Sequence, residues 1–291
     1  MQFFLQVALS GVATGAIYGL IAVGYSLTFM TTKVLNFALG MWVMIGGMLT
    51  YSLIVRAGLS PIIVLPIVMI GLFGFGILAE RVSVYPFLRA GSDVWVMSTL
   101  AVGLLFIDFA ELIWGRVPTP VPAYVGSDPL RLGGIVVMPQ QILTFGVAML
   151  LFLLLEYFYR RTLLGKAFRA VAHGPETASL MGINTRLVQL MSYATACALA
   201  GLAGFMVVPL TLAEPQLGTV LGLKAFAIAI IAGLGAPGGI LFCGLAYGAL
   251  EGLISGYLNT GLRDILGFSL MILVLFIRSE GLFGNAQRER A

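Results

Sequence analysis

The amino-acid sequence predicts an all-α integral membrane protein, a polytopic bundle of about eight or nine transmembrane helices over residues 1–291, with a short helix on its cytoplasmic side. First, 60% of the 291 residues are hydrophobic and only 10% are charged, with a mean hydropathy of +1.05. A soluble domain carries about 25% charged residues, so this chain cannot cover a water-facing surface. Second, apolar segments of about 20 residues, the length that crosses a membrane, recur along the chain. Third, Lys and Arg lie in short loops between them, which excludes a nucleic-acid-binding face as the cause of the net charge of +4.

Nine segments are long and apolar enough to be predicted as spans. The first is too long, and lacks the preceding basic residues, for a cleaved signal peptide. The seventh and eighth are separated only by "GLGAPGG" (233–239), so they are alternatively a re-entrant hairpin or one broken helix. The nine segments are 3–30, 37–55, 62–80, 94–115, 139–159, 187–210, 219–235, 240–258 and 264–278.

The distribution of basic residues predicts the orientation. Nine spans place the two termini on opposite sides, and the cytoplasmic side of a membrane protein carries the excess of Lys and Arg. With the C-terminus cytoplasmic and the N-terminus outside, the outer side holds Arg56, Arg116, Arg131, Lys224 and Arg263. The inner side then holds more than twice as many, namely Lys33, Arg81, Arg89, Arg160, Arg161, Lys166, Arg169, Arg186, Arg278, Arg288 and Arg290.

Two glycine ladders predict close helix packing. Small residues at every fourth position form a smooth stripe on which another helix backbone can approach closely. The first and eighth segments carry such stripes, at Gly11, Gly15 and Gly19 and at Gly244, Gly248, Gly252 and Gly256.

The stretch "VLNFALGMW" (34–42) interrupts the apolar pattern at Asn36. Asn is a favoured N-cap, whose side chain accepts from free backbone N–H groups, so we expect a helix to begin near Phe37. Irregular backbone at membrane depth is tolerated where it lines a cavity. Asn36 is therefore either part of an inner gate or pathway, or an ordinary capped turn.

Asp108 and Glu111 are acidic residues inside the fourth segment. At i and i+3 they share one helix face, and a carboxylate in lipid is costly, so both must face the bundle interior, a partner subunit or water. Glu111 also lies close enough to the segment's end to reach the outer interface. Asp108 is the deeper candidate, either for a substrate ammonium group or for an ion pair with Lys224 or Arg116. Glu251 is expected to be isolated and hydrogen-bonded between helices.

The loop 160–186 is the longest polar stretch on the inner side. Gly174 breaks the chain, Pro175 suits a first helical turn, Glu176 complements the positive end of a helix and Gly182 can end it. This pattern predicts a short amphipathic helix over about 176–181. The residues alone leave two functions open: a site for a cytoplasmic partner, or an interfacial loop held to anionic lipid by Arg160, Arg161, Lys166 and Arg169.

The sequence carries no pattern typical of an enzyme or of a metal site. Cys197 and Cys243 lie in apolar segments without ligand spacing, and the single histidine, His173, has no partner nearby. No catalytic triad and no phosphate-binding GxxxxGK[ST] is present, so we expect no bound cofactor, and any ATP hydrolysis must occur on another chain. The outer loop 116–138 contains four prolines and is expected to be a stiff, extended connection, either a docking surface or simply a loop.

Several blocks resemble a known family. "ETASLMGI" (176–183) resembles the EAA-type signature of permeases of the ATP-binding-cassette importers; Glu176, Ala178 and Gly182 match it and Thr177 departs. "GVATGAIYGLIAVGYSLTF", "VLNFALG", "KAFRAVAHGPETASLMGIN", "LGLKAFAIAIIAGLGAPGG" and "FIRSEGLFG" are similar, in order, to branched-chain amino acid permeases of the LivH type. Leu39 stands where that family usually has histidine, so no role of that histidine is carried over.

The resemblance implies a permease subunit in a bacterial cytoplasmic membrane that contains no enzyme chemistry of its own. It implies that Glu176, Ala178 and Gly182, with Arg169 nearby, form a coupling helix for cytoplasmic ATPases that hold the ATP and Mg²⁺. The implied partners are a second, LivM-like permease or a second copy, two ATPase subunits and an extracytoplasmic amino-acid-binding protein. The implied cargo is leucine, isoleucine or valine, with urea, short amides or other amino acids as alternatives. The rival function is a secondary transporter or channel driven by an ion gradient through Asp108.

Overall fold

The computed structural model describes residues 2–89, 94–126, 128–132, 135–235, 237–258, 261–278 and 281–284, and it confirms the helical membrane fold. Each of the nine predicted segments coincides with a helix, and the end points agree within a few residues. The helices are α1 (Gln2–Thr32), α2 (Leu39–Tyr51), η1 (Ser52–Arg56), α3 (Pro61–Ala79), η2 (Glu80–Val84), α4 (Tyr85–Arg89), α5 (Trp95–Trp114), α6 (Pro139–Arg161), α7 (Leu163–His173), α8 (Pro175–Leu180), α9 (Thr185–Val207), α10 (Leu217–Ala232), α11 (Pro237–Tyr257) and α12 (Leu262–Ile277).

Seven helices in the described part of the chain are long and apolar enough to cross a membrane. They are α1, α2 with η1, α3 with its continuation to Phe87, α5, α6, α9 and α11. Helices α10 and α12 have 16 residues each, about 24 Å, which is shorter than the roughly 30 Å hydrocarbon core. The seventh and eighth predicted segments are therefore separate helices of different length, and Gly233, with φ +90°, ends the shorter one.

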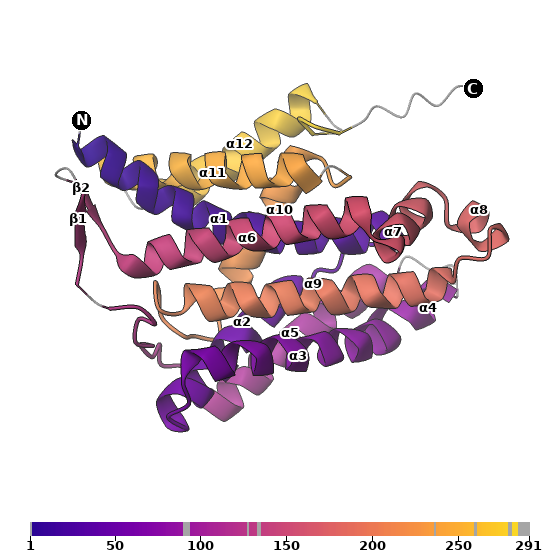
Figure 1. Cartoon of the computed structure of the whole chain (residues 1–291), viewed down its shortest axis with the longest axis horizontal. Helices are drawn as coiled ribbons and strands as arrows, with labels where there is room; N and C mark the ends of the chain where they lie inside the picture. The colour runs from indigo at the N-terminus through magenta and orange to yellow at the C-terminus, as the bar shows by residue number, and fades with distance from the viewer. Residues whose placement is uncertain are drawn as a thin grey trace.

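The centre of the bundle is formed by α1 and α9. Most of α9 and the last two thirds of α1 are buried, whereas α5 and α6 are mostly exposed and apolar. Figure 1 shows how these helices are arranged. Helix α1 packs against α11 on one side and α9 on another, and α9 packs in turn against α2 and α3. The buried positions of α1 and α9 include many Gly and Ala residues, which permit the close approach.

The two glycine ladders face each other between α1 and α11. A Cβ placed on Gly11 or Gly15 would lie closer than 3.0 Å to the backbone of Gly248 or Gly244. A Cβ on Gly252 would meet the carbonyl oxygen of Val7 at 2.7 Å, and one on Gly256 would meet the Val7 side chain at 2.9 Å. At Gly19 there is more room, because a Cβ there would lie 3.9 Å from the Gly244 Cα. The backbones are thus in direct contact along this seam, as small residues at every fourth position permit.

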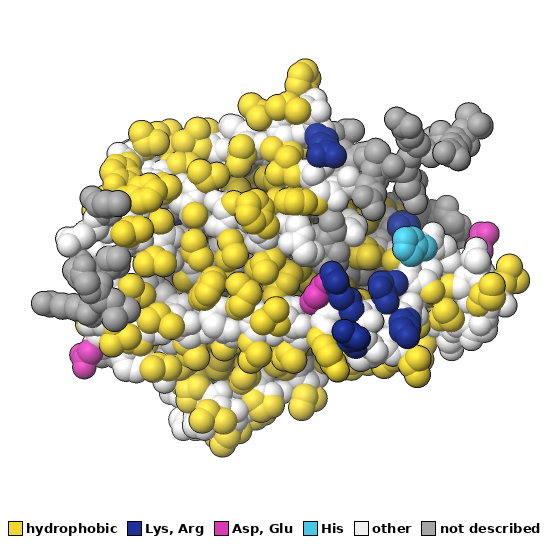
Figure 2. Space-filling model, turned by 45° about the horizontal axis from the view of Figure 1, so that its top comes forward, with side chains coloured by type: hydrophobic (Ala, Val, Ile, Leu, Met, Phe, Trp, Pro, Cys, Tyr) yellow, Lys and Arg dark blue, Asp and Glu magenta, His cyan; other side chains and the backbone are white. Residues whose placement is uncertain are grey.

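The two ends of the bundle differ. One end, the hairpin end, carries the start of α1 and a two-stranded antiparallel hairpin of β1 (Leu130–Leu132) and β2 (Ile135–Val137) (Figure 1). This hairpin lies in the loop 116–138, where the sequence predicted an extended connection. The opposite end, the α7–α8 end, carries α7 and α8. Figure 2 shows hydrophobic side chains over the middle of one face and Lys and Arg side chains gathered toward the α7–α8 end.

A short backbone bridge joins two loops at the hairpin end. The Thr119 N–H donates to the Ala213 carbonyl at 3.0 Å, and the Ala213 N–H donates to the Thr119 carbonyl at 2.8 Å. The loop that follows α5 is therefore fixed to the connection between α9 and α10.

Candidate functional site: a docking helix and a membrane cavity

Helices α7 and α8 form a compact module at the α7–α8 end. The Thr162 hydroxyl caps α7 by accepting the Gly165 N–H at 3.0 Å. Helix α8 begins with Pro175 and ends at Leu180, one residue from the prediction at each end. Gly182 has φ +81°, a backbone conformation that glycine adopts without strain, and the Ile183 N–H then reaches the Ala178 carbonyl at 3.0 Å. Helix α7 itself was not predicted, although its strongly amphipathic pattern was a usable signal.

The side chains of this module divide into a buried and an exposed set. Ala178 is buried in a small core with Phe168, Val171 and Val188, so α8 is fixed against α7 and α9. Glu176 and Arg169 are exposed. Leu180 and Met181 are 88% and 79% exposed, which leaves an apolar surface beside the Glu176 carboxylate at the end of the molecule. A surface of this kind fits a protein partner.

The Asn36 turn differs from the prediction. Helix α2 begins at Leu39, and its N-cap residue is Ala38, with no side-chain cap. Asn36 is buried, and its Oδ1 accepts the Ala38 N–H at 3.1 Å. This is an Asx turn, which competes with capping because the side chain satisfies the N–H two residues on. The preceding Lys33 has φ +57° and donates from Nζ to the Ala172 carbonyl of α7 at 3.2 Å.

The Asn36 turn places Phe37 at one end of a cavity of about 610 Å³ between α2, α5 and α10. Leu100 and Glu111 of α5 both line it, so the cavity follows that helix for about 16 Å. Toward the hairpin end its lining is polar and charged, and toward the α7–α8 end it is aromatic. The polar lining residues are Asp108, Glu111, Arg116, Gln216 and Thr219.

Three aromatic side chains form what we call the aromatic floor: Tyr25, Phe37 and Phe226. The Phe37 and Phe226 ring centroids are 5.5 Å apart, and those of Tyr25 and Phe226 are 5.6 Å apart. Beside the cavity, α2 and α10 touch through their backbones, because a Cβ on Gly40 would lie closer than 3.0 Å to Gly218 and Gly222. The cavity therefore ends in a packed aromatic layer.

The two acids of α5 have different surroundings. The Arg116 Nε lies 2.6 Å from a Glu111 carboxylate oxygen, so the charge of Glu111 is compensated. Asp108 is exposed to the cavity and makes no ion pair within the described part of the chain. The prediction that Asp108 pairs with Lys224 or Arg116 is wrong, because both cations are held by other carboxylates.

Lys224 is buried and belongs to an ionic network that sequence reasoning missed. Its Nζ lies 2.6 Å from Glu251 Oε1 and 2.8 Å from Asp264 Oδ1, and the Arg263 Nε lies 2.8 Å from the same Glu251 oxygen. The Tyr18 hydroxyl also donates to Glu251, at 3.3 Å. Glu251 is thus hydrogen-bonded between helices, as expected, but it is not isolated, and Lys224 is buried within α10. The available signal was that a buried cation and a buried acid in neighbouring spans must find partners.

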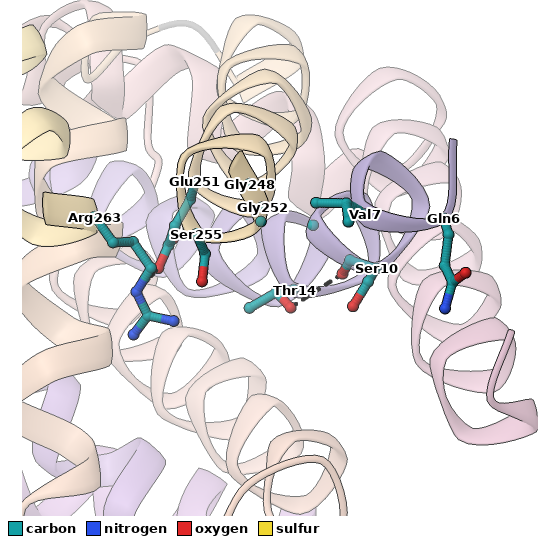
Figure 3. A pocket seen from close by; sticks show the side chains of 11 residues that line it. Gln6, Val7, Ser10, Thr14, Gly248, Glu251, Gly252, Ser255 and Arg263 are labelled. Atoms are coloured by element: carbon teal, nitrogen blue, oxygen red, sulfur yellow. Dashed lines mark hydrogen bonds and ion pairs between the residues drawn. The ribbon is translucent and has the colours of Figure 1, made fainter. Parts of the chain in front are cut away.

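A second cavity of about 340 Å³ opens next to this network (Figure 3). Glu251 and Arg263 stand at one side of it and Ser10 and Thr14 of α1 at another, with the ladder residue Gly248 between them. The network therefore lies directly beside the glycine seam of α1 and α11.

Glu80 and Arg186 form a second ion pair that sequence reasoning missed. The two terminal guanidinium nitrogens of Arg186 reach the two carboxylate oxygens of Glu80, and Nη2 lies 2.7 Å from Oε2. The Glu80 side chain is fully buried. The guanidinium carbon also lies 3.6 Å from the centre of the Tyr85 ring. Arg186 follows α8 by six residues, so the pair joins the start of α9 to η2 at the end of α3.

No cluster of three His, Cys, Asp or Glu residues that could hold a metal ion occurs in the described ranges. Cys197 and Cys243 are free and buried. His173 ends α7 and is exposed.

Comparison with known proteins identifies the family. The model described as "Branched-chain amino acid transport system / permease component" matches residues 7–275. The chain is 30% identical to the high-affinity branched-chain amino acid transport system permease protein LivH of Salmonella typhimurium, over 99% of this chain and 98% of the relative. It is 29% identical to BraD of Pseudomonas aeruginosa, with the same coverage. The ribose import permease protein RbsC of Escherichia coli is 34% identical over 45% of this chain and 40% of its own length. This multi-pass membrane protein belongs to the family of permease components of branched-chain amino acid transport systems, the membrane subunits of ATP-driven importers.

Proposed function

We propose that the chain imports branched-chain amino acids across a bacterial cytoplasmic membrane, together with cytoplasmic ATPases, a second permease subunit or copy, and an extracytoplasmic binding protein. The names of the relatives that match over nearly the full chain support this substrate class. ATP and Mg²⁺ are held by the ATPases, and this chain supplies the path.

The observation that carries the proposal is the α7–α8 module. Ala178 fixes α8 to the bundle, while Glu176, Leu180 and Met181 face away from it. This arrangement is what a rigid docking helix requires, because motion of an attached ATPase is passed on only if the helix cannot move independently. The exposed apolar residues supply contact area, and the carboxylate of Glu176 supplies orientation.

We assign the α7–α8 end to the cytoplasm and the hairpin end to the outside. Lys33, Arg160, Arg161, Lys166 and Arg169 all lie at the α7–α8 end or in the segments leading to it, which agrees with the basic excess of cytoplasmic loops. Arg288 and Arg290, which the sequence places on the same side, lie outside the described residues.

The cavity between α2, α5 and α10 is the proposed path, open toward the outside and closed inside by the aromatic floor. Transport by alternating access requires such a layer to separate while the outer mouth closes. Lys33 links the α7–α8 module to the aromatic floor. Its side chain donates a hydrogen bond to α7, and it lies four residues before Phe37. Movement of the docking module therefore has a short route to the floor.

Co-purification with the ATPases tests the docking assignment. Glu176→Arg and Gly182→Arg are expected to lose the ATPase subunits while the permease still inserts, because the first reverses a charge on the surface and the second strains the φ +81° turn. Asp128→Arg is the matched control: it reverses an exposed charge in the loop 116–138, at the hairpin end, and should retain the ATPases. The measurement is the molar ratio of ATPase to permease after purification from membranes.

The outcome separates the two function classes. Loss in both variants and retention in the control support the importer. A folded wild-type permease that retains no ATPase under any condition contradicts it. The unpaired Asp108 then favours the second candidate, ion-driven transport, which predicts that uptake stops when an uncoupler is added at constant ATP.

A further inference from the structure

The charge of Asp108 is uncompensated in a helix that spans the membrane. Its neighbour Glu111 is held by Arg116 at 2.6 Å, whereas Asp108 faces the cavity without an ion pair in the described ranges. A carboxylate at membrane depth is retained only where it meets water or a cation. Helix α5 thus contributes two acids to the cavity lining, and Asp108 is the one that has no ion pair among the described residues.

Thr219 of α10 also lines the cavity, and its hydroxyl group can donate a hydrogen bond to an anion. The hydroxyl oxygen of Thr219 is buried and has no hydrogen-bond partner within the described part of the chain. Thr219 lies in the first turn of α10, and Gln216 and Gly218 of the same turn also line the cavity. A buried hydroxyl without a partner is unfavourable, and the start of a helix favours an anion, so this wall suits a carboxylate.

From these polar groups toward the aromatic floor, the lining is hydrocarbon. Met41 of α2, Leu104 and Ile107 of α5, and Leu223 and Phe226 of α10 contribute it. The volume of about 610 Å³ lies within the range of roughly 300–1,000 Å³ that small-molecule sites occupy. The cavity is therefore apolar in its body and has a small number of polar groups, which fix the orientation of a ligand.

We propose that this cavity binds a free amino acid as a zwitterion: Asp108 receives the ammonium group, Thr219 and the first turn of α10 receive the carboxylate, and the apolar wall receives the side chain. A simple cation would compensate Asp108 but would leave the Thr219 hydroxyl without a partner. An apolar solute would bind neither group. An apolar amino acid satisfies all three. This inference rests on the proposed function and assigns the residues that hold its substrate within the membrane.

A cysteine reporter in the cavity tests the inference directly. Leu104 lines the cavity and is 63% exposed, and the native cysteines, Cys197 and Cys243, are buried. In Leu104→Cys, assembled with its partner subunits in lipid nanodiscs, we expect leucine to slow labelling by a charged maleimide. Leucinamide, which lacks the carboxylate, and 4-methylpentanoate, which lacks the ammonium group, should each protect at least about tenfold less well, because each loses one charged hydrogen bond.

Substitutions in the reporter background assign the two ends of the ligand. Asp108→Asn should raise the half-protecting leucine concentration about tenfold or more and remove the preference for leucine over 4-methylpentanoate. Thr219→Val, which keeps the shape, should remove the preference over leucinamide. Glu156→Gln, which removes an exposed carboxylate outside the cavity, is the comparison for charge alone and should change leucine protection by less than about threefold.

Three results would overturn the inference: absence of leucine protection in the reporter, equal protection by 4-methylpentanoate, or unchanged protection in Asp108→Asn. Because labelling reports occupancy and not turnover, these results are separable from failure of the importer function. Retained ATPases and ATP-driven uptake together with any of the three place the substrate elsewhere and leave the function standing.

Discussion

At the scale of single residues, the protein places charges in the membrane in two ways. Lys224 and Arg263 balance the charges of Glu251 and Asp264, and the Tyr18 hydroxyl completes the network, whereas Asp108 faces the cavity. Buried ion pairs contribute little net stability, but removal of one partner leaves an uncompensated charge. The network is therefore a point where a single substitution has a large effect on stability.

Lys224→Met is expected to lower the free energy of unfolding by about 3 kcal/mol, because the buried Glu251 then keeps only the partly exposed Arg263 as a cation. The double variant Lys224→Met with Glu251→Leu should recover most of it. The measurement is thermal unfolding of the purified permease in detergent. Glu156→Gln, which breaks an exposed pair with Arg160, is the control and should cost at most about 1 kcal/mol. A single variant as stable as the control would contradict the prediction.

At the scale of elements, the seam between α1 and α11 depends on missing side chains. Gly248→Ala is expected to separate the two helices, because the new Cβ would lie closer than 3.0 Å to the backbone of Gly11 and Gly15. Such overpacking typically lowers the free energy of unfolding by about 1–3 kcal/mol. The matched control is Gly146→Ala on α6, where nothing lies within 4 Å and the change should be neutral or slightly stabilising. Equal melting temperatures for the two variants would show that the helices shift apart without cost.

At the scale of the whole molecule, the Glu80–Arg186 pair joins the start of α9, which directly follows the α7–α8 module, to η2 at the end of α3. Arg186→Lys keeps the charge but loses the two-point contact with Glu80 and the stacking on Tyr85. We expect leucine uptake per ATP hydrolysed to fall several-fold while the ATPases remain bound. Arg160→Lys, an exposed substitution at the same end, should leave this ratio unchanged. Loss of ATPase binding in Arg186→Lys would instead indicate that the pair only supports the folded module.

How much of this was predictable differs between elements and side chains. Hydropathy and length determine a membrane helix locally, so all nine helical segments and the position of α8 follow from the sequence. Ion-pair partners do not, because Lys224, Glu251 and Asp264 lie on three helices and meet only when these pack. The Asn36 turn was half predictable: residue type indicated a bonded Asn, but two local hydrogen-bond patterns compete for the same side chain. Gly182 and Pro175, by contrast, have backbone demands that few residues meet, and their roles were read correctly.

The backbone bridge between Thr119 and Ala213 has a thermodynamic consequence. It fixes the loop 116–138 to the segment that leads into α10, and the first turn of α10 lines the mouth of the cavity. A protein that binds this loop more tightly when the mouth is open must, by reciprocity, make the open mouth more populated when it is bound. Delivery of cargo and opening of the path then become one equilibrium, with a single coupling free energy shared between them.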